Sequence, residues 1–481
     1  MMFSRKDFLK RLLLLIAFPL FSSVAKAENQ PNPREEDFDV IVIGSGAAGL
    51  TAAIFAAKKG ARVAVLEKMA VIGGNTLISS GILNAPDPQR QKKQGISDSE
   101  ELFYEQSLQA GQNKSDPELL KTLVQNAKPT LDWLESIGVK FKKRVFQVYG
   151  GLWPRSHYPS ISHGRGYVAA LSEECRKLNI PIITNAQVTE IVKDGDKVVG
   201  VKTLHKGKEE TFFAKKAVII ASGGFTANLE MCSALDPRLA GMKYTGSPSA
   251  TGEMLKIAQQ AGAKLAGLED IQCNLGPDIG YVHRSGFHLD VTRHILVNNQ
   301  GERFVAEDDT RDHIRDAVLS QPDKVVFSVV DKEGFQNLSS LFQQAGILGE
   351  REGEHFSAGT LEELAQKMKV PVDNLLKSVR LYNEAVDTKK DSFGRESWML
   401  VQKIQNPPFY AARVRMAVHY TMGGIAINPQ AQVLDTSNHP IPGLYAAGEV
   451  TTGVHGTNRV GGNGLLDAFV FGRIAGEMAA R

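Results

Sequence analysis

Glycine-dense backbone surrounds one cation and one histidine near the C-terminus, in residues 441–467. The cation is Arg459 and the histidine is His455. Glycine has no Cβ, so backbone of this kind can approach a ligand closely and adopt positive φ. The planar guanidinium of arginine binds a carboxylate through two hydrogen bonds. The pattern fits a loop that holds an anionic ligand, and equally an ordinary surface loop between a strand at 444–447 and a helix at 465–479.

A second glycine pattern, near the N-terminus, has the spacing of a dinucleotide-binding turn. An apolar run, Phe38–Ile43, predicts a buried parallel strand, and Gly44-Ser45-Gly46-Ala47-Ala48-Gly49 follows it directly. A helix at 50–60 and a strand at 62–66 are predicted next, and Glu67 comes 23 residues after Gly44. The glycines allow a tight turn, close approach of a pyrophosphate and packing of helix on strand, and Glu67 can accept from ribose hydroxyls. The helix N-terminus stabilises phosphate charge, so the set predicts dinucleotide binding.

The length of the chain limits the number of domains that could position these groups, and its charge limits the class of partner. The 481 residues exceed the roughly 250–300 at which one core usually divides into domains. Hydrophobic residues make up 42% and charged residues 23%, which is typical of a globular protein. The formal charge is +3, but residues 1–27 hold five basic side chains against Asp7, a net +4, which leaves −1 for the remainder. A near-neutral body argues against nucleic acid as a partner.

Residues 1–27 are predicted to be an export signal, followed by a polar linker at 28–37. The segment has a basic start, an apolar run at 12–21 and Ala25-Lys26-Ala27 before Glu28. A run of about ten residues is too short for a stable membrane span, although a membrane anchor is the alternative. Ser4–Lys10 is similar to a twin-arginine signal with Lys6 in place of the second arginine. The predicted destination is the periplasm.

The three cysteines, Cys175, Cys232 and Cys273, are widely spaced and form no C-x-x-C or C-x-x-C-H motif. The chain is therefore predicted to carry no c-type haem, no iron–sulfur cluster and no cysteine metal site of its own.

A third glycine loop, Gly73–Thr76, comes soon after the second strand and is followed by Ser79-Ser80-Gly81. Here the chain resembles the soluble fumarate reductases of the flavocytochrome c group, which are related to the succinate dehydrogenase flavoprotein. The resemblance implies FAD, bound non-covalently, because Asn75 and Thr76 stand where relatives with covalent FAD have a histidine. The implied cofactor-binding residues are Gly44, Gly46, Ala48, Gly49, Glu67, Lys68, Gly74, Asn75, Thr76, Ser80, Gly81, Val188, Ala221, Gly223, Gly224, Glu253, Gly448, Glu449, Arg459, Gly464 and Leu465.

The predicted fold is α/β. It consists of a Rossmann-like FAD-binding domain with a β-meander at 182–214, interrupted by an α+β capping domain. The FAD-binding domain is assigned to residues 38–265 and 406–481, and the capping domain to residues 266–405. The change of pattern after about residue 265 indicates the first boundary, and Pro407-Pro408 marks the return.

Three motifs in the last third of the chain match the family's catalytic motifs. His419 lies in His-Tyr-Thr-Met-Gly-Gly, Arg459 lies in the C-terminal glycine-rich stretch, and Arg311 lies in Thr-Arg-Asp. The resemblance implies that His419 and Arg459 bind a substrate carboxylate, with Gly462 beside them, and that Arg311 donates a proton. Reduction of an electron-poor C=C bond needs a hydride from flavin N5 on one carbon and a proton on the other.

The residues expected at the substrate's other end depart from the family pattern. Aligned without gaps, a histidine that binds a second carboxylate falls on Asn274, and a Thr-Glu pair falls on Gly286-Phe287. The arginine of the family's proton relay falls on Asp290, so the relay is left open between Asp290 and His288. Burying an unpaired second carboxylate is costly. Asn274 and Phe287 are therefore predicted to contact a monocarboxylic 2-enoate such as methacrylate or acrylate.

The resulting hypothesis is a periplasmic FAD-dependent enoate reductase that receives electrons from a separate c-type cytochrome. Fumarate, urocanate and cinnamate are alternative substrates. A dehydrogenase or oxidase that runs the reverse chemistry on the same fold is a second hypothesis. A non-catalytic electron-shuttling flavoprotein is a third.

Overall fold

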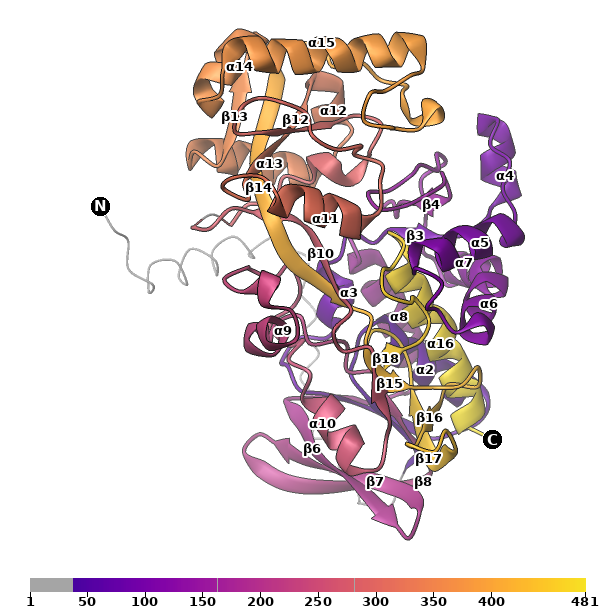
Figure 1. The fold of residues 1–481 in the computed structure, drawn as a ribbon. Helices are drawn as coiled ribbons and strands as arrows, with labels where there is room; N and C mark the ends of the chain where they lie inside the picture. Colours follow the sequence, from indigo (N-terminus) through magenta and orange to yellow (C-terminus); the bar gives the residue numbers. More distant parts are fainter. Residues whose placement is uncertain (1–37, 162, 281) are drawn as a thin grey trace, which may run out of the picture.

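A computed structural model describes residues 38–161, 163–280 and 282–481. The predicted export signal at 1–27 and the predicted linker at 28–37 lie outside the described residues. The chain forms a lower part, built on a parallel sheet, and an upper part with a sheet of its own (Figure 1).

The main sheet is built around β1 (Phe38–Ile43), which pairs in parallel with β2 (Val63–Glu67) and β8 (Lys208–Ile220). The order continues through β5 (Ile182–Thr184) on one side and β17 (Pro440–Ala446) and β16 (Gln432–Leu434) on the other. The strand residues of β1 and β2 are almost all buried, which explains why they form continuous apolar runs. This confirms the predicted α/β sheet.

Helix α2 (Ala47–Lys58) follows β1 and packs between α8 (Arg165–Lys177) and the C-terminal helix α16 (Asn463–Ala479). The contact with α16 is close because glycines face it. A Cβ at Gly472 would lie 2.5 Å from the carbonyl oxygen of Ala48, and one at Gly476 would lie 2.2 Å from that of Ala52. The C-terminal helix thereby holds the helix that follows the first glycine loop.

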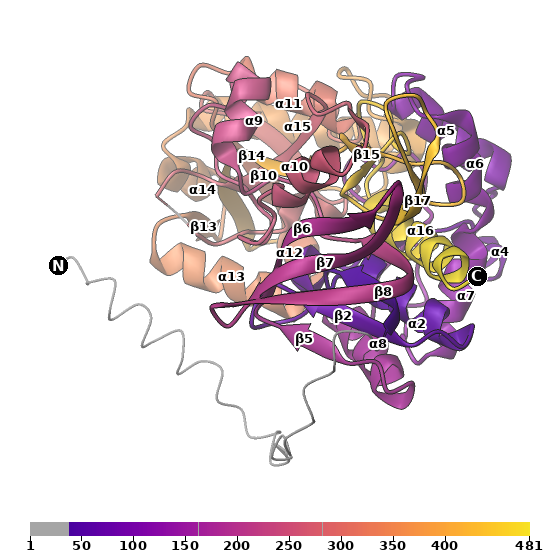
Figure 2. The ribbon, with the colours of Figure 1, turned by 90° about the horizontal axis from the view of Figure 1, so that it is seen from below.

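The predicted β-meander is present as β6 (Ala186–Asp194), β7 (Lys197–His205) and β8, paired antiparallel in sequence order. Figure 2 shows it from below. Its strands alternate between buried and exposed residues, as expected for a sheet with one solvated face. The long strand β8 belongs to both the meander and the main sheet, because its first residues pair with β7 and its last residues pair with β1.

The upper part has a five-stranded sheet and a separate hydrophobic core. Its strands are β10 (Ile271–Pro277), β11 (Ile295–Asn298), β12 (Val326–Val330), β13 (His355–Ala358) and β14 (Phe409–Thr421). Its helices are α11 (Arg311–Leu319), α12 (Lys332–Gln336), α13 (Ser340–Arg351), α14 (Leu361–Met368) and α15 (Val372–Thr388). We refer to this part as the cap. The domain boundaries stay a prediction, and β14 pairs with cap strands although it lies beyond residue 406.

Strand β14 runs from the top of the cap down to the centre of the molecule (Figure 1). Near its lower end the ladder with β10 contains an irregularity. Gln272 pairs with Tyr420 and Cys273 pairs with Val418, so His419 has no residue opposite it. A bulge of this kind re-aims a side chain.

The helices predicted between residues 97 and 140 are α5 (Glu100–Ala110), α6 (Pro117–Gln125) and α7 (Ala127–Ser136). As expected, Asp116 caps α6 by accepting from the N–H groups of Glu118 and Leu119. The remaining short elements are α3 (Gly74–Ile78), β3 (Leu83–Asn84), α4 (Pro88–Gln91), β4 (Ser156–His157), α9 (Leu229–Leu235), α10 (Glu253–Gln260), β9 (Leu265–Ala266), β15 (Gly424–Ala426), β18 (Thr451–Thr452) and the 3₁₀ turns at 92–94, 237–239, 287–289 and 397–399.

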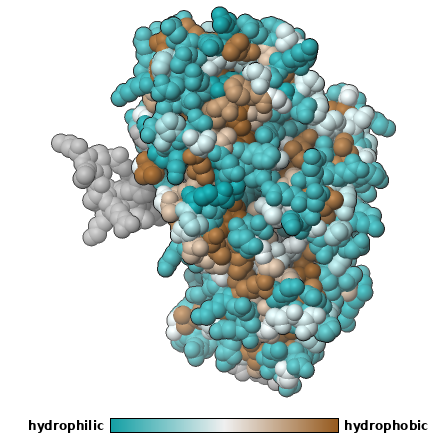
Figure 3. All heavy atoms as spheres, in the orientation of Figure 1, coloured by the Kyte–Doolittle hydropathy of each residue, from teal (hydrophilic) through white to brown (hydrophobic). Residues whose placement is uncertain are grey.

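Hydrophilic residues cover most of the face in Figure 3, and apolar residues reach the surface in smaller groups between them. Among the residues that the structure describes, no helix has both the length and the apolar character needed to cross a bilayer.

Candidate functional site

A cavity lies where the carboxyl ends of the parallel strands meet the cap. Ligands of open α/β sheets bind at this edge. Its walls come from the residues that follow β1, β2, β8 and β17, and from the cap residues Asn274, Arg284, Leu289 and Arg311. His419, at the end of β14, lines the same cavity. Residues from both predicted parts of the FAD-binding domain and from the cap therefore share one site.

The three glycines of the first loop, Gly44, Gly46 and Gly49, differ in what a side chain would meet at each position. Gly44 has φ +103°, and its Cβ would lie 2.4 Å from the carbonyl oxygen of Ala221. A Cβ at Gly49 would lie 1.9 Å from the carbonyl oxygen of Gly44, so glycine there is needed for packing. Gly46 differs, because its φ is −74° and its nearest contact would be Thr76 Oγ1 at 3.6 Å. The space beside Gly46 is therefore not filled by protein atoms, and it is part of the cavity next to the N-terminus of α2.

Glu67 lines the cavity at the end of β2, but its carboxylate already holds the loop. One oxygen accepts from the N–H of Ser45 at 3.1 Å and from its hydroxyl at 2.6 Å. The other accepts from the N–H of Met69 at 2.8 Å. A carboxylate can accept about four hydrogen bonds, and Glu67 already accepts three. Its remaining lone pair could accept the ribose hydroxyl contact that the fingerprint predicts.

The other predicted cofactor residues form contacts among themselves across the cavity wall. Lys68 pairs with Glu253, and its ammonium also donates to the Thr251 hydroxyl at 2.9 Å. The Asn75 amide donates to Glu449 at 3.1 Å, which links the third glycine loop to the C-terminal stretch. Burial raises the pKa of Glu449 to about 7. These pairs join segments that are far apart in sequence.

Two arginines meet at the cap end of the cavity. Nη1 of Arg311 and Nη2 of Arg459 each donate to Oε1 of Gln272, both at 3.0 Å. Arg311 also donates to the carbonyl oxygen of Tyr149 from Nε and Nη2, at 3.3 and 3.1 Å. Arg459 lies 4.1 Å from the centroid of the Tyr420 ring. Burial, and to a smaller extent the positive charge of Arg459, holds the pKa of Arg311 well below its usual value.

His419 lies in the same cluster, and Nδ1 is 2.6 Å from the hydroxyl of Thr245. Burial and then the charge of Arg311 hold its pKa well below the usual value, so the imidazole is neutral near pH 7. A neutral imidazole whose Nδ1 accepts from Thr245 carries its proton on Nε2.

Arg284 is a third cavity-lining arginine, which was not predicted from the sequence. It is half-buried, and burial lowers its pKa to about 10. Within the described ranges, its guanidinium has no hydrogen-bond or ion-pair partner, and its Nε is buried without one. No spacing or motif singles out Arg284 in the sequence. Only the fold of the loop after β10 brings it to the cavity.

Most of the predicted site residues line the cavity, and three do not. Gly49 packs beneath the first loop, and a Cβ at Gly224 would lie 2.2 Å from Thr421 Oγ1. Phe287 is buried in the cap, with its ring 6.2 Å from that of Phe335 and 5.8 Å from that of His355. Asn274 does line the cavity, and its Oδ1 accepts from the N–H of Leu275 at 2.8 Å.

The two relay candidates differ in their surroundings. Asp290 contacts Thr292, Asn337 and two arginines, so its carboxylate is well supplied with partners. His288 is buried, and among the described residues neither of its ring nitrogens has a hydrogen-bond partner. Its ring lies 5.1 Å from that of Tyr149, whose backbone carbonyl binds Arg311.

Comparison with known proteins gives concordant matches. Residues 39–465 match the family described as FAD binding domain. The cytochrome-type fumarate reductase of Shewanella frigidimarina is 38% identical over 451 residues, which are 92% of this chain and 77% of that protein. The NADH:fumarate oxidoreductase of Klebsiella pneumoniae is 34% identical over 99% of this chain, but the chain spans only 51% of its length.

The structural comparison agrees. The open conformation of a flavocytochrome c3 fumarate reductase superposes with a TM-score of 0.72 at 31% identity. The match covers 100% of this chain and 81% of that one.

Proposed function

The chain belongs to the family of FAD-dependent oxidoreductases that includes the fumarate reductase flavoproteins, and from this premise we propose that it reduces the C=C bond of a 2-enoate. The observation that carries the proposal is the cluster of Arg284, Arg311 and Arg459 at one end of the cavity. In the part of the chain that the structure describes, none of the three forms an ion pair with a carboxylate, so this end of the cavity suits an anionic ligand.

FAD fits the remainder of the cavity, and its binding is proposed to be non-covalent. Gly46 and Gly223 line the wall, and a Cβ at either would meet no protein atom within 3.5 Å. The space next to them suits a ligand that approaches backbone closely. Asn75 and Thr76, in the third loop, offer no imidazole nitrogen of the kind that a histidine would supply for a covalent link to the flavin. FAD supplies the hydride when it is bound and reduced.

The substrate carboxylate is proposed to bind Arg459, whose guanidinium is held in place by Gln272 and the Tyr420 ring. His419 is proposed to add a hydrogen bond from Nε2, in the tautomer whose Nδ1 accepts from the Thr245 hydroxyl. Withdrawal of charge toward this clamp makes the carbon β to the carboxylate the better hydride acceptor. Positioning and charge stabilisation of this kind can supply several kcal/mol of barrier reduction.

Arg311 is proposed to deliver the proton to the α-carbon, so that one hydride and one proton convert C=C to CH–CH. A free guanidinium stays protonated far above neutral pH. Here burial and the neighbouring cations favour its neutral form, which makes it a stronger acid. A solvent proton must then recharge Arg311 in each turnover.

Acrylate or methacrylate is the first candidate substrate. Asn274 lines the cavity where a dicarboxylate reductase would be expected to place a histidine, and Gly286-Phe287 supplies no charged donor. Fumarate is a second candidate, favoured by one observation: Arg284 offers a further cation in the same cavity. The two candidates differ in whether Arg284 binds a substrate carboxylate.

Electrons are proposed to come from a separate c-type cytochrome, since the sequence has no C-x-x-C-H motif. The periplasmic location rests on the export signal predicted in residues 1–27. Purification from a periplasmic fraction, with the haem content measured, tests both. Covalently bound haem c in the purified chain would contradict the separate donor.

The deciding experiment is an anaerobic assay with reduced viologen against acrylate, methacrylate, fumarate, urocanate and cinnamate, using the wild type and Arg284→Met. If an acrylate-type substrate is best and Arg284→Met leaves its kcat/KM within a few-fold, the first candidate holds. A preference for fumarate that Arg284→Met abolishes would select the second. Failure to reduce any enoate would reject the proposal, and flavin reduction by a saturated acid or steroid would favour the reverse chemistry.

A further inference from the structure

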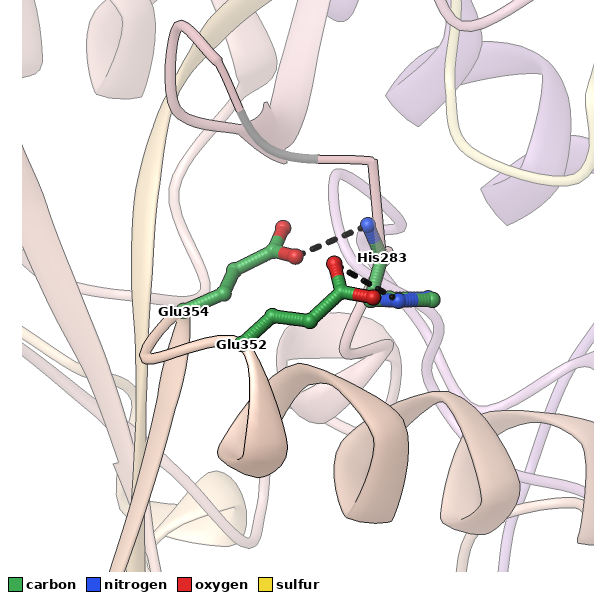
Figure 4. Close-up of side chains that lie close together, drawn as sticks. All are labelled: His283, Glu352 and Glu354. Carbon is green, nitrogen blue, oxygen red and sulfur yellow. Dashed lines mark hydrogen bonds and ion pairs between the residues drawn. The ribbon is translucent and has the colours of Figure 1, made fainter. Parts of the chain in front are cut away.

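Three potential metal ligands from separate segments of the cap lie together outside the cavity (Figure 4). His283 is in the loop after β10, Glu352 follows α13, and Glu354 directly precedes β13. One ligand atom from each lies within 4.8 Å of the other two. His283 Nε2 is 3.3 Å from a carboxylate oxygen of Glu352.

Glu354 distinguishes this group from a surface ion pair. It has no exposed area, whereas the side chain of Glu352 is 55% exposed. One Glu354 oxygen accepts from the backbone N–H of His283 at 3.0 Å, and the other is buried without a hydrogen-bond partner among the described residues. A buried carboxylate oxygen of this kind lacks the cation or donor that normally satisfies it.

The backbone holds Glu354 in place. Its N–H donates to the carbonyl oxygen of Gly349 at 2.8 Å, and its own carbonyl oxygen accepts from the N–H of Arg413 at 3.3 Å. The buried carboxylate is therefore presented to His283 by two rigid elements, α13 and β14. Glu352 can adjust its side chain from the surface.

We propose that His283, Glu352 and Glu354 together bind one divalent transition-metal ion of the Zn²⁺ type. One imidazole nitrogen and two carboxylate oxygens suit Zn²⁺, Co²⁺ or Ni²⁺ better than Mg²⁺ or Ca²⁺, which prefer oxygen ligands alone. With metal–ligand bonds of about 2.0–2.1 Å, tetrahedral ligands lie roughly 3.3 Å apart. The His283–Glu352 separation already has this value. A fourth position is left for water.

The site would fasten the loop that carries Arg284. That loop begins near Asp278, which pairs with Arg413 and Arg415 of β14. A metal at His283 would fix the loop a second time, one residue before the arginine that lines the cavity. The binding itself does not depend on the proposed function, whereas any effect on Arg284 does.

The test uses the full chain with its flavin, stripped with a chelator and titrated with Zn²⁺ by calorimetry. We expect about one ion per chain, a higher thermal unfolding temperature with Zn²⁺, and at least a tenfold loss of affinity in His283→Gln, Glu352→Gln and Glu354→Gln. Glu352→Gln is the safest of these, because its side chain is exposed.

His205→Gln is the matched control. His205 pairs with Glu210 at 3.0 Å in the meander, and among the described residues no second carboxylate joins this pair in a potential metal site. The control should keep the wild-type affinity and stoichiometry. The proposal is wrong if the wild type binds no Zn²⁺, or if Glu352→Gln and His205→Gln bind it equally well. The result stands apart from any reductase assay.

Discussion

Arg311 and Arg459 donate to the same atom, Oε1 of Gln272, each at a distance of 3.0 Å. Two cations are thus held side by side by a neutral acceptor instead of a carboxylate. An amide oxygen orients both guanidinium groups without cancelling either charge. This arrangement fits the roles proposed above, substrate binding for Arg459 and protonation for Arg311.

Replacing Gln272 tests this arrangement. Gln272→Leu removes the shared acceptor, so we expect kcat/KM for the best enoate to fall roughly 10–100-fold, since hydrogen bonds to charged groups contribute about 1.5–3 kcal/mol. Gln272→Glu would pair with both cations and compete with the substrate, so it should raise KM most. Steady-state kinetics on flavin-loaded protein decide, and unchanged kinetics in both variants would contradict the assigned role.

The loss of proton donation by Arg311 can be distinguished from a general disruption of the cavity. Arg311→Gln keeps hydrogen-bonding groups but cannot donate a proton to carbon, so kcat should fall by roughly 10²–10⁴-fold. The flavin content should remain that of the wild type. Arg315→Gln is the control, because Arg315 is on the same helix and pairs with Asp316 at 2.8 Å. Substantial turnover in Arg311→Gln would assign the proton to another group.

The first loop predicts opposite behaviour for two of its glycines. Gly46→Ala should fold, because its Cβ meets nothing closer than 3.6 Å, yet lose FAD affinity because the cofactor is proposed to occupy that space. Gly49→Ala should fail to fold stably, because its Cβ would lie 1.9 Å from the carbonyl oxygen of Gly44. Circular dichroism and bound-flavin absorbance measure the two effects. Full FAD binding by Gly46→Ala would place the pyrophosphate elsewhere.

Asp308 gives the fold a pH dependence of predictable sign. Burial raises the pKa of its carboxyl to about 6, well above the usual value for an aspartate. The folded state therefore binds the proton more tightly, and this stability is lost as pH rises from about 4 through 6. Asp308→Asn should gain on the order of 1–3 kcal/mol relative to the wild type between pH 4 and pH 7.5.

Urea unfolding at the two pH values measures the gain for Asp308→Asn. The amide can still accept from the N–H of Glu396, which donates to Asp308 at 2.9 Å. Asp323→Asn, at a position near the surface, serves as the control and should show no such change. A constant difference between Asp308→Asn and the wild type would contradict the raised pKa.

Local pattern was enough to predict the first βαβ unit, the meander and the capped helix α6. Each of these depends on neighbours in sequence: an apolar run, a glycine spacing, or Asp116 before Pro117. Arg311, His419 and Arg459, which were singled out by family motifs, all line the cavity, and their roles there stay a prediction.

Residues that act through long-range contacts were not predictable in the same way. Gln272 touches Arg459 across 187 positions, and Thr245 touches His419 across 174. Neither has a distinctive local pattern. Alignment with the family pattern, made without gaps, predicted that Phe287 would contact the substrate. The structure instead places Arg284, from the same loop, at the cavity wall. Loop conformation, which sequence spacing does not encode, decides that difference.

The bulge in the ladder between β10 and β14 has a consequence for evolution of the site. His419 is the residue that the ladder does not need, because Val418 and Tyr420 already pair with successive residues of β10. Deleting one residue here would restore regular pairing, so a more regular strand is one mutational step away. The irregular strand would therefore persist only under continued selection for the side chain at position 419. In a lineage that stopped using the reaction, we expect the bulge to be lost early.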